Sequence, residues 1–249
     1  MKDSLGREID YLRISLTESC NLRCIYCMPE GVAPKVCGET LTKENIFNIV
    51  EVAVELNIKK IRLTGGEPLL RQDIVEIVQG IKDRGIEKIY ITTNGILLSE
   101  KIEKLKKAGL KGVNISLDTL DREQFNYITR GGDLERVLQG IEKALNLNLE
   151  VKINSVIMKD INENAIEELA KLTLNSQLDV RFIELMPIGQ GKKFTGISNN
   201  DIYDRLEKIF EFDRDYKEIK GVSTYYKLKN SKGNTNIKES LDKNVEKKR

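Results

Sequence analysis

Segments of strand-like sequence alternate with helical segments from Tyr11 to Phe210, and this alternation constrains the fold more than any other feature. Consecutive β-α-β units give parallel strands joined by right-handed crossovers. A closed barrel of this kind needs eight units, and the sequence supplies six. We therefore predict an α/β fold class, a partial (β/α)6 barrel of parallel strands that is open on one side. The strands are expected at Tyr11–Thr17, Lys60–Thr64, Lys88–Thr93, Gly112–Asp118, Glu150–Met158 and Val180–Met186.

The segments between these strands carry apolar residues at helical spacing. Thr42 and Ser99 are expected to cap the helices that follow them, and Gly109 to end the second of these. The other helices are expected over Asp73–Arg84, from Leu134 to Leu145, over Asn162–Leu174 and over Asp201–Phe210.

The end of the chain has a different composition. We assign residues 1–211 to the barrel and residues 212–249 to a largely polar C-terminal tail. From Lys229 onward the only apolar residues are Ile237, Leu241 and Val245, and such a composition favours disorder.

The predicted strands alternate apolar and polar residues, whereas parallel strands buried on both faces read as nearly continuous apolar runs. Successive side chains point to opposite faces of a sheet. We therefore assign the apolar set to the helices and the polar set to a wet barrel interior, where clustered cations would bind an anionic ligand. The alternative is that some strands lie at an edge with one face in solvent. The cations of the polar set are Arg13, Arg62, Lys152 and Arg181.

Cys20, Cys24 and Cys27 follow the first strand at the spacing C-x3-C-x2-C. A [4Fe–4S] cluster usually takes four cysteines, so three from one loop would leave one iron open for a reacting ligand. Alternatively, Cys37 supplies a fourth ligand, giving a closed zinc site or a ferredoxin-like electron carrier. A disulfide framework is disfavoured, because four cysteines in 249 residues without a signal peptide indicate a reducing compartment.

The composition excludes several classes of function. The chain has no histidine, which rules out Ser-His-Asp catalysis, Cys-His nucleophiles and metal sites with histidine ligands. Lys and Arg number 41 against 39 Asp and Glu, and a net charge of +2 gives no indication of nucleic-acid binding. No apolar run has membrane-spanning length, so we expect a cytoplasmic protein.

Two further motifs are ambiguous in the sequence. Gly65-Gly66-Glu67-Pro68 follows the second strand and either brings bare backbone close to a ligand or forms a simple turn. Asp118 and Glu184 are either catalytic carboxylates or buried partners of Arg13 or Arg181.

Taken in order, the motifs resemble a known family. C-N-L-R-C-I-Y-C-M-P and T-G-G-E-P resemble the radical S-adenosylmethionine (SAM) superfamily. A finer set is similar to the GTP 3′,8-cyclase family of molybdenum-cofactor (molybdopterin) biosynthesis, and the similarity runs from Leu5 to Gly233. This set comprises G-R-E-I-D-Y-L-R-I-S-L-T, T-T-N-G, N-I-S-L-D, V-K-I-N and R-F-I-E-L-M-P.

The resemblance implies one [4Fe–4S] cluster on Cys20, Cys24 and Cys27, with SAM completing the coordination of the fourth iron. The family's SAM contacts correspond to Tyr26, Gly66, Ser116 and Met186, and its GTP contacts to Arg13, Arg62, Thr92 and Lys152. All four GTP positions belong to the polar set described above. No protein side chain is implied as catalytic, because the radical from reductively cleaved SAM acts on the ribose of GTP. A flavodoxin- or ferredoxin-like reductant is implied as a partner, and a homodimer is left open.

The chain departs from the family in one respect. The family binds a second cluster through three further cysteines near the C-terminus, but no cysteine follows Cys37 here. We therefore expect a truncated or frameshifted product with SAM cleavage intact and GTP turnover impaired. The alternatives are a radical SAM enzyme for another anionic substrate and a non-catalytic iron–sulfur or electron-transfer module.

Overall fold

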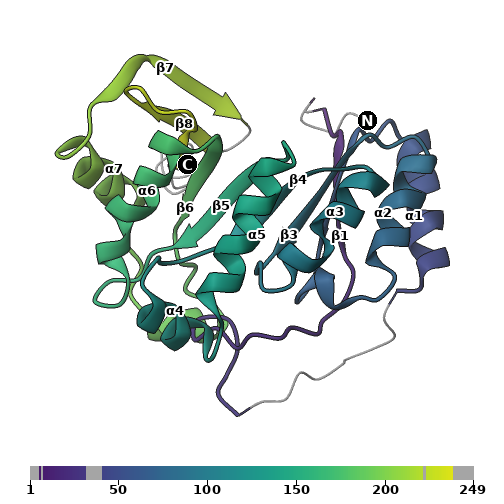
Figure 1. The fold of residues 1–249 in the computed structure, drawn as a ribbon, viewed down its shortest axis with the longest axis horizontal. Coiled ribbons are helices and arrows are strands. Elements are labelled where there is room, and N and C mark those ends of the chain that lie inside the picture. The colour runs from purple at the N-terminus through teal and green to yellow at the C-terminus, as the bar shows by residue number, and fades with distance from the viewer. Residues whose placement is uncertain (1–5, 7, 32–40, 221–222, 238–249) are drawn as a thin grey trace. The chain divides into compact units, whose positions relative to one another are not determined.

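The computed structural model describes residues 6, 8–31, 41–220 and 223–237 of the chain (Figure 1). These residues divide into two compact units. The first comprises Met1–Leu22, Gly31–Ile115 and Glu135–Val151, and the second comprises Arg23–Glu30, Ser116–Leu134 and Lys152–Arg249.

The first unit contains four parallel strands that pair in chain order. They are β1 (Tyr11–Ser15), β2 (Lys60–Thr64), β3 (Lys88–Thr93) and β4 (Leu110–Ser116). The helices are α1 (Lys43–Glu55), α2 (Ile74–Asp83), α3 (Leu98–Ala108) and α5 (Leu134–Asn146), with a short 3-10 helix η1 (Pro68–Leu70) after β2. Helices α1, α2 and α3 lie side by side (Figure 1). Strands β2 and β3 have the predicted bounds.

Burial along the strands alternates as the sequence predicts. Ile61 and Leu63 in β2 are fully buried, whereas Arg62 between them is half-buried. In β1, Ile14 is buried and the neighbouring Arg13 is exposed. Burial of apolar surface is the main favourable term in folding, so the apolar faces form the core of this unit and the polar faces remain for other contacts.

Helix ends in this unit follow local chemistry. Thr42 caps α1 as predicted, with its Oγ1 accepting a 3.2 Å hydrogen bond from the backbone N–H of Asn45. Gly109 ends α3 in the left-handed region at a φ of 113°, also as predicted. The predicted cap at Ser99 is wrong, because the N-cap is Leu97, which makes no side-chain capping bond. Ser99 lies inside the first turn instead.

The second unit contains the remaining strands, in the order β5-β6-β9-β8-β7. They are β5 (Glu150–Val156), β6 (Leu178–Ile183), β7 (Phe212–Lys220), β8 (Ser223–Leu228) and β9 (Thr235–Ile237). The helices are α4 (Arg122–Thr129), α6 (Ile166–Asn175) and α7 (Asn199–Glu207), with 3-10 helices η2 (Glu163–Ala165) and η3 (Gly189–Lys193). All six predicted strands are present and alternate with helices, which confirms the α/β class.

Three parts of this unit differ from the sequence-based expectation. Strands β7 and β8 were not predicted; they pair antiparallel within the segment that was assigned to a polar tail. Helix α4 was not predicted; it begins at the N-cap Asp121, whose side chain accepts from the backbone N–H of Gln124 at 2.7 Å. The polar segment expected to be disordered from Lys229 contains β9, which pairs in parallel with β6. Backbone pairing satisfies its polar groups without an apolar side-chain pattern. Residues 238–249 lie outside the described residues, and the division of the chain at residue 211 stays a prediction.

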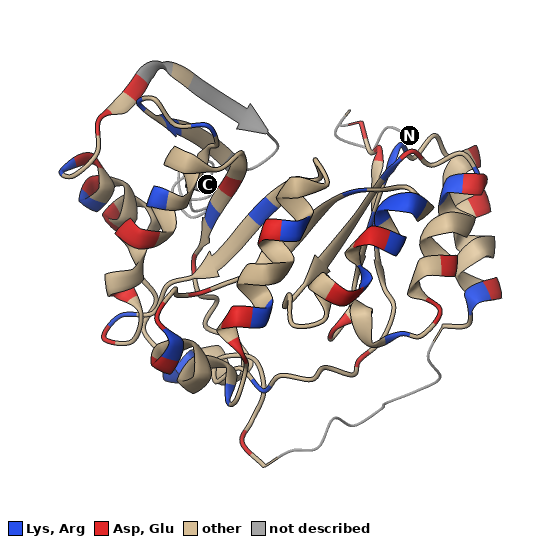
Figure 2. Ribbon diagram, viewed as in Figure 1, with Lys and Arg blue, Asp and Glu red and all other residues tan. Residues whose placement is uncertain are grey.

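Charges of both signs are mixed along the helices (Figure 2). In the described part of the chain, no helix combines the length and the apolar character that crossing a membrane requires.

Candidate functional site

The first half of the cysteine loop contains Cys20 and ends at Leu22, and it belongs to the first unit. The thiol of Cys20 accepts two weak hydrogen bonds, from the backbone N–H of Leu22 at 3.4 Å and from the side-chain amide of Asn94 at 3.8 Å. Asn94 follows β3, so two segments that are distant in the sequence meet at this sulfur. Asn94 was not predicted as a site residue.

The glycines after β2 are required by close contact with the cysteine loop. The backbone N–H of Gly66 donates to the carbonyl of Thr17 at 2.6 Å, and that of Glu67 donates to the carbonyl of Ser19 at 2.7 Å. A Cβ on Gly66 would lie 2.6 Å from the carbonyl oxygen of Glu18 and closer still to that of Ser19. The motif therefore brings the protein's own backbone close, which the sequence left open between a ligand and a turn.

Glu67 is fully buried and joins the ends of β2 and β3. Its Oε1 accepts from the backbone N–H of Leu69 at 2.9 Å and from the hydroxyl of Thr93 at 2.8 Å. Its Oε2 accepts from the backbone N–H of Asn94 at 2.7 Å. Burial raises the pKa of this carboxyl, and the three donors oppose that rise. Glu67 is thus engaged within the protein.

The second half of the cysteine loop belongs to the second unit and forms a tight turn. The backbone N–H groups of Cys27 and Met28 both donate to the carbonyl of Cys24, at 2.9 and 3.0 Å. The backbone N–H of Ile25 donates to the carbonyl of Ile128 at 2.9 Å, which ties the turn to the end of α4. The relative positions of Cys24 and Cys27 are therefore fixed by backbone bonds.

Arg130 holds the same turn from outside. Its guanidinium donates to the carbonyl of Arg23 at 3.2 Å and to that of Met28 at 3.0 Å, so one side chain spans the residues that flank Cys24 and Cys27. Arg130 itself has a φ of 55°, in the left-handed region, as the C-cap of α4. Arg130 was not predicted as a site residue, because a lone arginine after a helix gives no signal of a contact to a distant loop.

Tyr26 lies between the two cysteines and donates its hydroxyl to Oδ2 of Asp118 at 2.7 Å. Oδ1 of Asp118 accepts from the backbone N–H of Val156 at 2.8 Å. Asp118 is only 5% exposed, and burial raises its pKa to about 6 against the opposing effect of these two donors. The structure favours the second of the two sequence-based interpretations, a buried paired carboxylate, but its partner is Tyr26 and not an arginine.

In the first unit, three predicted GTP contacts lie on neighbouring strands. Arg13 in β1 and Arg62 in β2 are direct register partners, and Thr92 in β3 is the partner of Asn114 in β4. Asn114 is 1% exposed, and neither polar atom of its side chain has a hydrogen-bond partner among the described residues. The guanidinium of Arg62 lies 5.5 Å from the ring centroid of Tyr11.

In the second unit, the fourth predicted GTP contact is part of a charged network. The ammonium of Lys152 donates to Asp179 at 2.7 Å and to the hydroxyl of Tyr225 at 3.3 Å, and Arg181 donates to the same hydroxyl at 2.9 Å. Burial alone would raise the pKa of Tyr225, but the two cations beside it lower that pKa. Lys152 and Arg181 thus donate to the same hydroxyl. They are two of the four cations that the alternating pattern placed on one face of the strands.

The other predicted site residues have simpler surroundings. Ser116, the last residue of β4, is half-buried, and Met186 is 66% exposed after β6. Cys37 lies outside the described residues.

The three cysteines of the loop fit an iron–sulfur cluster by their chemistry. They are thiols outside any disulfide, with Cys27 exposed and the other two half-buried. Within the described residues, no three Cys, Asp or Glu side chains stand close enough to bind a single metal ion. Each thiolate of a cluster binds a different iron, so these ligands need not surround one ion, and soft sulfur donors suit iron–sulfur clusters.

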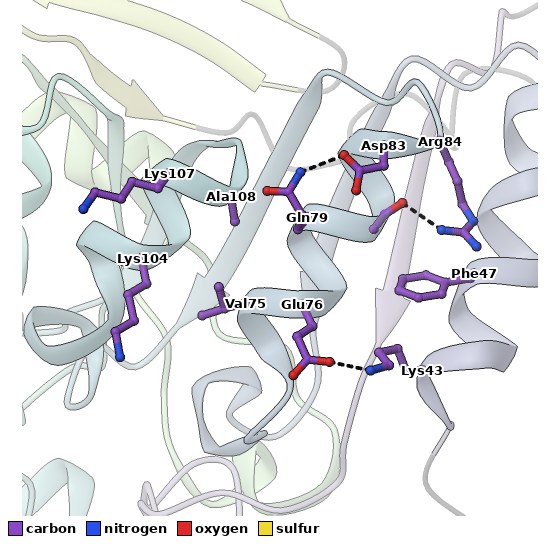
Figure 3. A pocket seen from close by; sticks show the side chains of 11 residues that line it. Lys43, Phe47, Val75, Glu76, Gln79, Asp83, Arg84, Lys104, Lys107 and Ala108 are labelled. Carbon is purple, nitrogen blue, oxygen red and sulfur yellow. Dashed lines mark hydrogen bonds and ion pairs between the residues drawn. The ribbon is translucent and has the colours of Figure 1, made fainter.

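A separate cavity lies on the helical side of the first unit. It has a volume of about 670 Å³ between α1, α2 and α3 and contains none of the predicted site residues (Figure 3). Two of its lining residues, Lys43 and Glu76, form an ion pair, and Arg84 lies 4.1 Å from the ring centroid of Phe47 (Figure 3).

The sequence matches the family model of the radical SAM superfamily over residues 14–173, more than half of the chain. The chain therefore belongs to the radical SAM superfamily, whose members use a [4Fe–4S] cluster and SAM.

Within that superfamily, two similar relatives are GTP 3′,8-cyclases. The chain is 48% identical over 237 residues to the GTP 3′,8-cyclase of Clostridium perfringens (strain SM101), covering 94% of this chain and 73% of that protein. It is 46% identical over 243 residues to the GTP 3′,8-cyclase of Alkaliphilus oremlandii, covering 95% of this chain and 75% of that protein. At this identity and coverage the chain is a member of the GTP 3′,8-cyclase family, which confirms the resemblance drawn from the motifs.

Solved structures support the fold. SuiB of Streptococcus suis bound to S-adenosylmethionine matches with a TM-score of 0.65 and 20% identity, covering 80% of this chain and 46% of that chain. The [FeFe]-hydrogenase maturase HydG matches with a TM-score of 0.58 and 18% identity, covering 77% of this chain and 47% of that chain. This chain thus spans less than half of these longer proteins. The matches confirm the predicted partial (β/α)6 barrel.

Proposed function

We propose that this chain is a radical SAM enzyme of the GTP 3′,8-cyclase type, with one [4Fe–4S] cluster, SAM and GTP as its ligands. The observation that carries the proposal is the cysteine loop itself. Both halves are fixed by hydrogen bonds from other elements of their own unit, the first through Gly66 and Glu67 and the second through Ile128 and Arg130. These hydrogen bonds hold Cys20 in place within the first unit and Cys24 and Cys27 within the second, as cluster ligands require.

In this proposal, Cys20, Cys24 and Cys27 hold the cluster, and SAM meets Tyr26, Gly66, Ser116 and Met186. When bound, the cluster supplies the electron that cleaves SAM reductively and so provides the radical chemistry. The side chains bind, orient and exclude water, which is the protein's share of such a reaction. Histidine is absent from the chain. A reaction in which the cofactors supply the chemistry and the side chains bind and orient requires no histidine as acid or base.

The GTP site rests on the cations. Arg13 and Arg62 are adjacent in register and present two guanidinium groups suited to phosphate oxygens. Lys152 already pairs with Asp179, so a phosphate at Lys152 would share that ammonium with a carboxylate. Thr92 adds a hydroxyl next to Asn114 in register. A flavodoxin- or ferredoxin-like protein would supply the electron.

These 249 residues contain four cysteines, three of which are assigned to the loop. On their own they therefore supply ligands for one cluster of this type. We expect them to cleave SAM and to bind GTP, but not to cyclise GTP efficiently.

Anaerobic reconstitution with iron and sulfide tests the cluster assignment. We expect four irons per chain, and 5′-deoxyadenosine when SAM and dithionite are added. Cys20→Ala should lose both, whereas Cys37→Ala should keep both. Loss of the cluster in Cys37→Ala would indicate a closed site and contradict the proposal. Eight irons per chain would indicate a second cluster site.

Equilibrium binding of GTP tests the substrate assignment without any cluster. Lys152→Met should weaken GTP binding by roughly tenfold, the equivalent of about 1.4 kcal/mol for one charge-assisted hydrogen bond. Lys159→Met removes an exposed cation that follows β5 and serves as the matched control. Equal affinity of both variants for GTP would show that Lys152 is not part of the GTP site.

A further inference from the structure

The side-chain amide of Asn94 has a fixed orientation. Its Oδ1 accepts a hydrogen bond from the backbone N–H of Ile96 at 3.1 Å, so the nitrogen must occupy the other side of the amide. That nitrogen donates to Oδ1 of Asn21 at 2.8 Å and lies 3.8 Å from Sγ of Cys20. Rotating the amide by 180° would place two acceptors against each other, so the N–H groups face the cysteine loop.

The backbone of Asn94 is also held in place. Its N–H donates to Oε2 of the buried Glu67 at 2.7 Å. The preceding Thr93 donates its hydroxyl to the same carboxylate and accepts from the backbone N–H of Gly95 at 3.0 Å. A side chain with its own backbone fixed on both sides loses little conformational entropy when it contacts the sulfur.

Two N–H groups therefore point at one thiol, the amide of Asn94 and the backbone of Leu22. Hydrogen bonds to the sulfurs of an iron–sulfur cluster are among the features that set its reduction potential. Donors stabilise the more negative, reduced cluster relative to the oxidised one, so they make the potential more positive. The backbone donor is common to any residue at position 22, whereas the amide donor depends on the residue at position 94.

We propose that Asn94 tunes the cluster, and that its amide donor to Cys20 makes the reduction potential more positive. Asn94 is a positioning residue in this role, because it acts through Cys20 and not on substrate. The inference rests on the proposed function, since it requires Cys20 to be a cluster ligand. Glu67 supports this role, because its carboxylate holds the backbone N–H of Asn94.

Two substitutions test the proposal in the full chain. Asn94→Ser keeps a short acceptor for the backbone N–H of Ile96 but no longer reaches Cys20. Asn94→Asp keeps the acceptor and the size, but replaces the donor with a negative charge. The midpoint potential is read from the EPR signal of the reduced cluster during a redox titration without SAM. We expect Asn94→Ser to shift the redox equilibrium roughly tenfold, about 59 mV, toward the oxidised cluster.

Asn94→Asp should shift the midpoint further in the same direction, because the charge repels the added electron. Asn57→Asp adds the same charge at an exposed residue between α1 and β2 and should leave the midpoint unchanged. A merely structural role would not produce this ordering of the variants.

The outcomes separate this inference from the proposed function. Midpoints equal to the wild type, with four irons per chain in both variants, would overturn the tuning role while leaving the function intact. Failure of both variants to load iron would also overturn it, since Asn94 would then serve assembly. Failure of the wild-type chain to build a cluster on its cysteine loop would instead refute the proposed function.

Discussion

The hydroxyl of Tyr26 donates a 2.7 Å hydrogen bond to Oδ2 of Asp118, a carboxyl that is only 5% exposed. This bond connects the middle of the cysteine loop to the residue that follows β4 by two positions. Burial and the carboxylate of Asp118 also raise the pKa of Tyr26 well above its usual value. The phenol therefore remains protonated and donates at physiological pH. Burial disfavours the ionised form of the carboxyl.

Asp118 should make the cluster-free protein less stable as the pH rises. Its pKa is raised from 3.8 to about 6, so the folded state binds the proton more tightly than the unfolded chain does. This contribution is fully present below pH 3.8 and is lost as the pH rises through 6. The total amounts to about 3 kcal/mol at 1.36 kcal/mol per pKa unit. Asp118→Asn removes it.

The measurement is urea unfolding of both proteins between pH 4 and pH 7. The free energy of unfolding of the wild type should fall relative to that of Asp118→Asn over this range. Parallel curves would show that the carboxyl does not titrate in this window.

Arg130 should determine how firmly the second half of the cysteine loop holds a cluster. Arg130→Ala removes both hydrogen bonds that one guanidinium nitrogen donates to the backbone carbonyls of Arg23 and Met28. We expect loss of iron to a chelator to be roughly tenfold faster in the alanine variant, as one charged hydrogen bond is worth about 1.5 kcal/mol or more. Arg136→Ala, which removes a surface ion pair with Glu100, is the control. Equal rates in the Arg130 and Arg136 variants would contradict the role.

Gly66→Ala and Gly80→Ala should have opposite effects. At Gly66 the new Cβ meets backbone carbonyls of the cysteine loop, which cannot move without breaking the loop's bonds. We expect a loss of about 1–3 kcal/mol, the usual cost of overpacking. At Gly80, inside α2, it meets the tip of the half-buried Phe47 ring (Figure 3), which can rotate away.

Alanine at position 80 then gains up to about 1 kcal/mol of helix propensity. Thermal or urea unfolding of the two variants gives the comparison. A stable Gly66→Ala protein with an intact loop would show that the close backbone approach is not required.

Glu67→Gln should destabilise the first unit by about 1–3 kcal/mol, because an amide NH2 would face one of the three donors and leave it unsatisfied. Glu87→Gln, at an exposed residue before β3, is the matched control and should be neutral. Denaturant unfolding gives the free energy of unfolding of the two variants and of the wild type. If both substitutions are neutral, the buried network contributes little to stability.

Much of the fold follows from local sequence rules. The bounds of β2 and β3 match the prediction because short apolar–polar alternations end at Gly65 and Asn94, residues that stop strands. Helix α4 was missed because its apolar residues are few and it directly follows a loop that reads as a continuation of β4. Strand β9 was missed because it is polar and depends on pairing with β6, a contact that no local pattern encodes.

The candidate site was predicted only in part. The cysteine spacing pointed to Cys20, and the alternation along the strands pointed to the cations. Each of these two patterns can be read within a few consecutive residues. Asn94, Arg130 and Asn114 were not identified as site residues, because their significance lies in contacts or missing contacts across the fold. A buried amide without a partner is visible only once the chain is folded.

The carboxylate of Glu67 is shared among three internal donors, so the loop after β2 buries its ionisable group, whereas Gly66 beside it is exposed. Peptide groups do not change their charge near neutral pH. A small molecule docking against Gly65 and Gly66 would therefore meet the same surface in acidic and in alkaline cells.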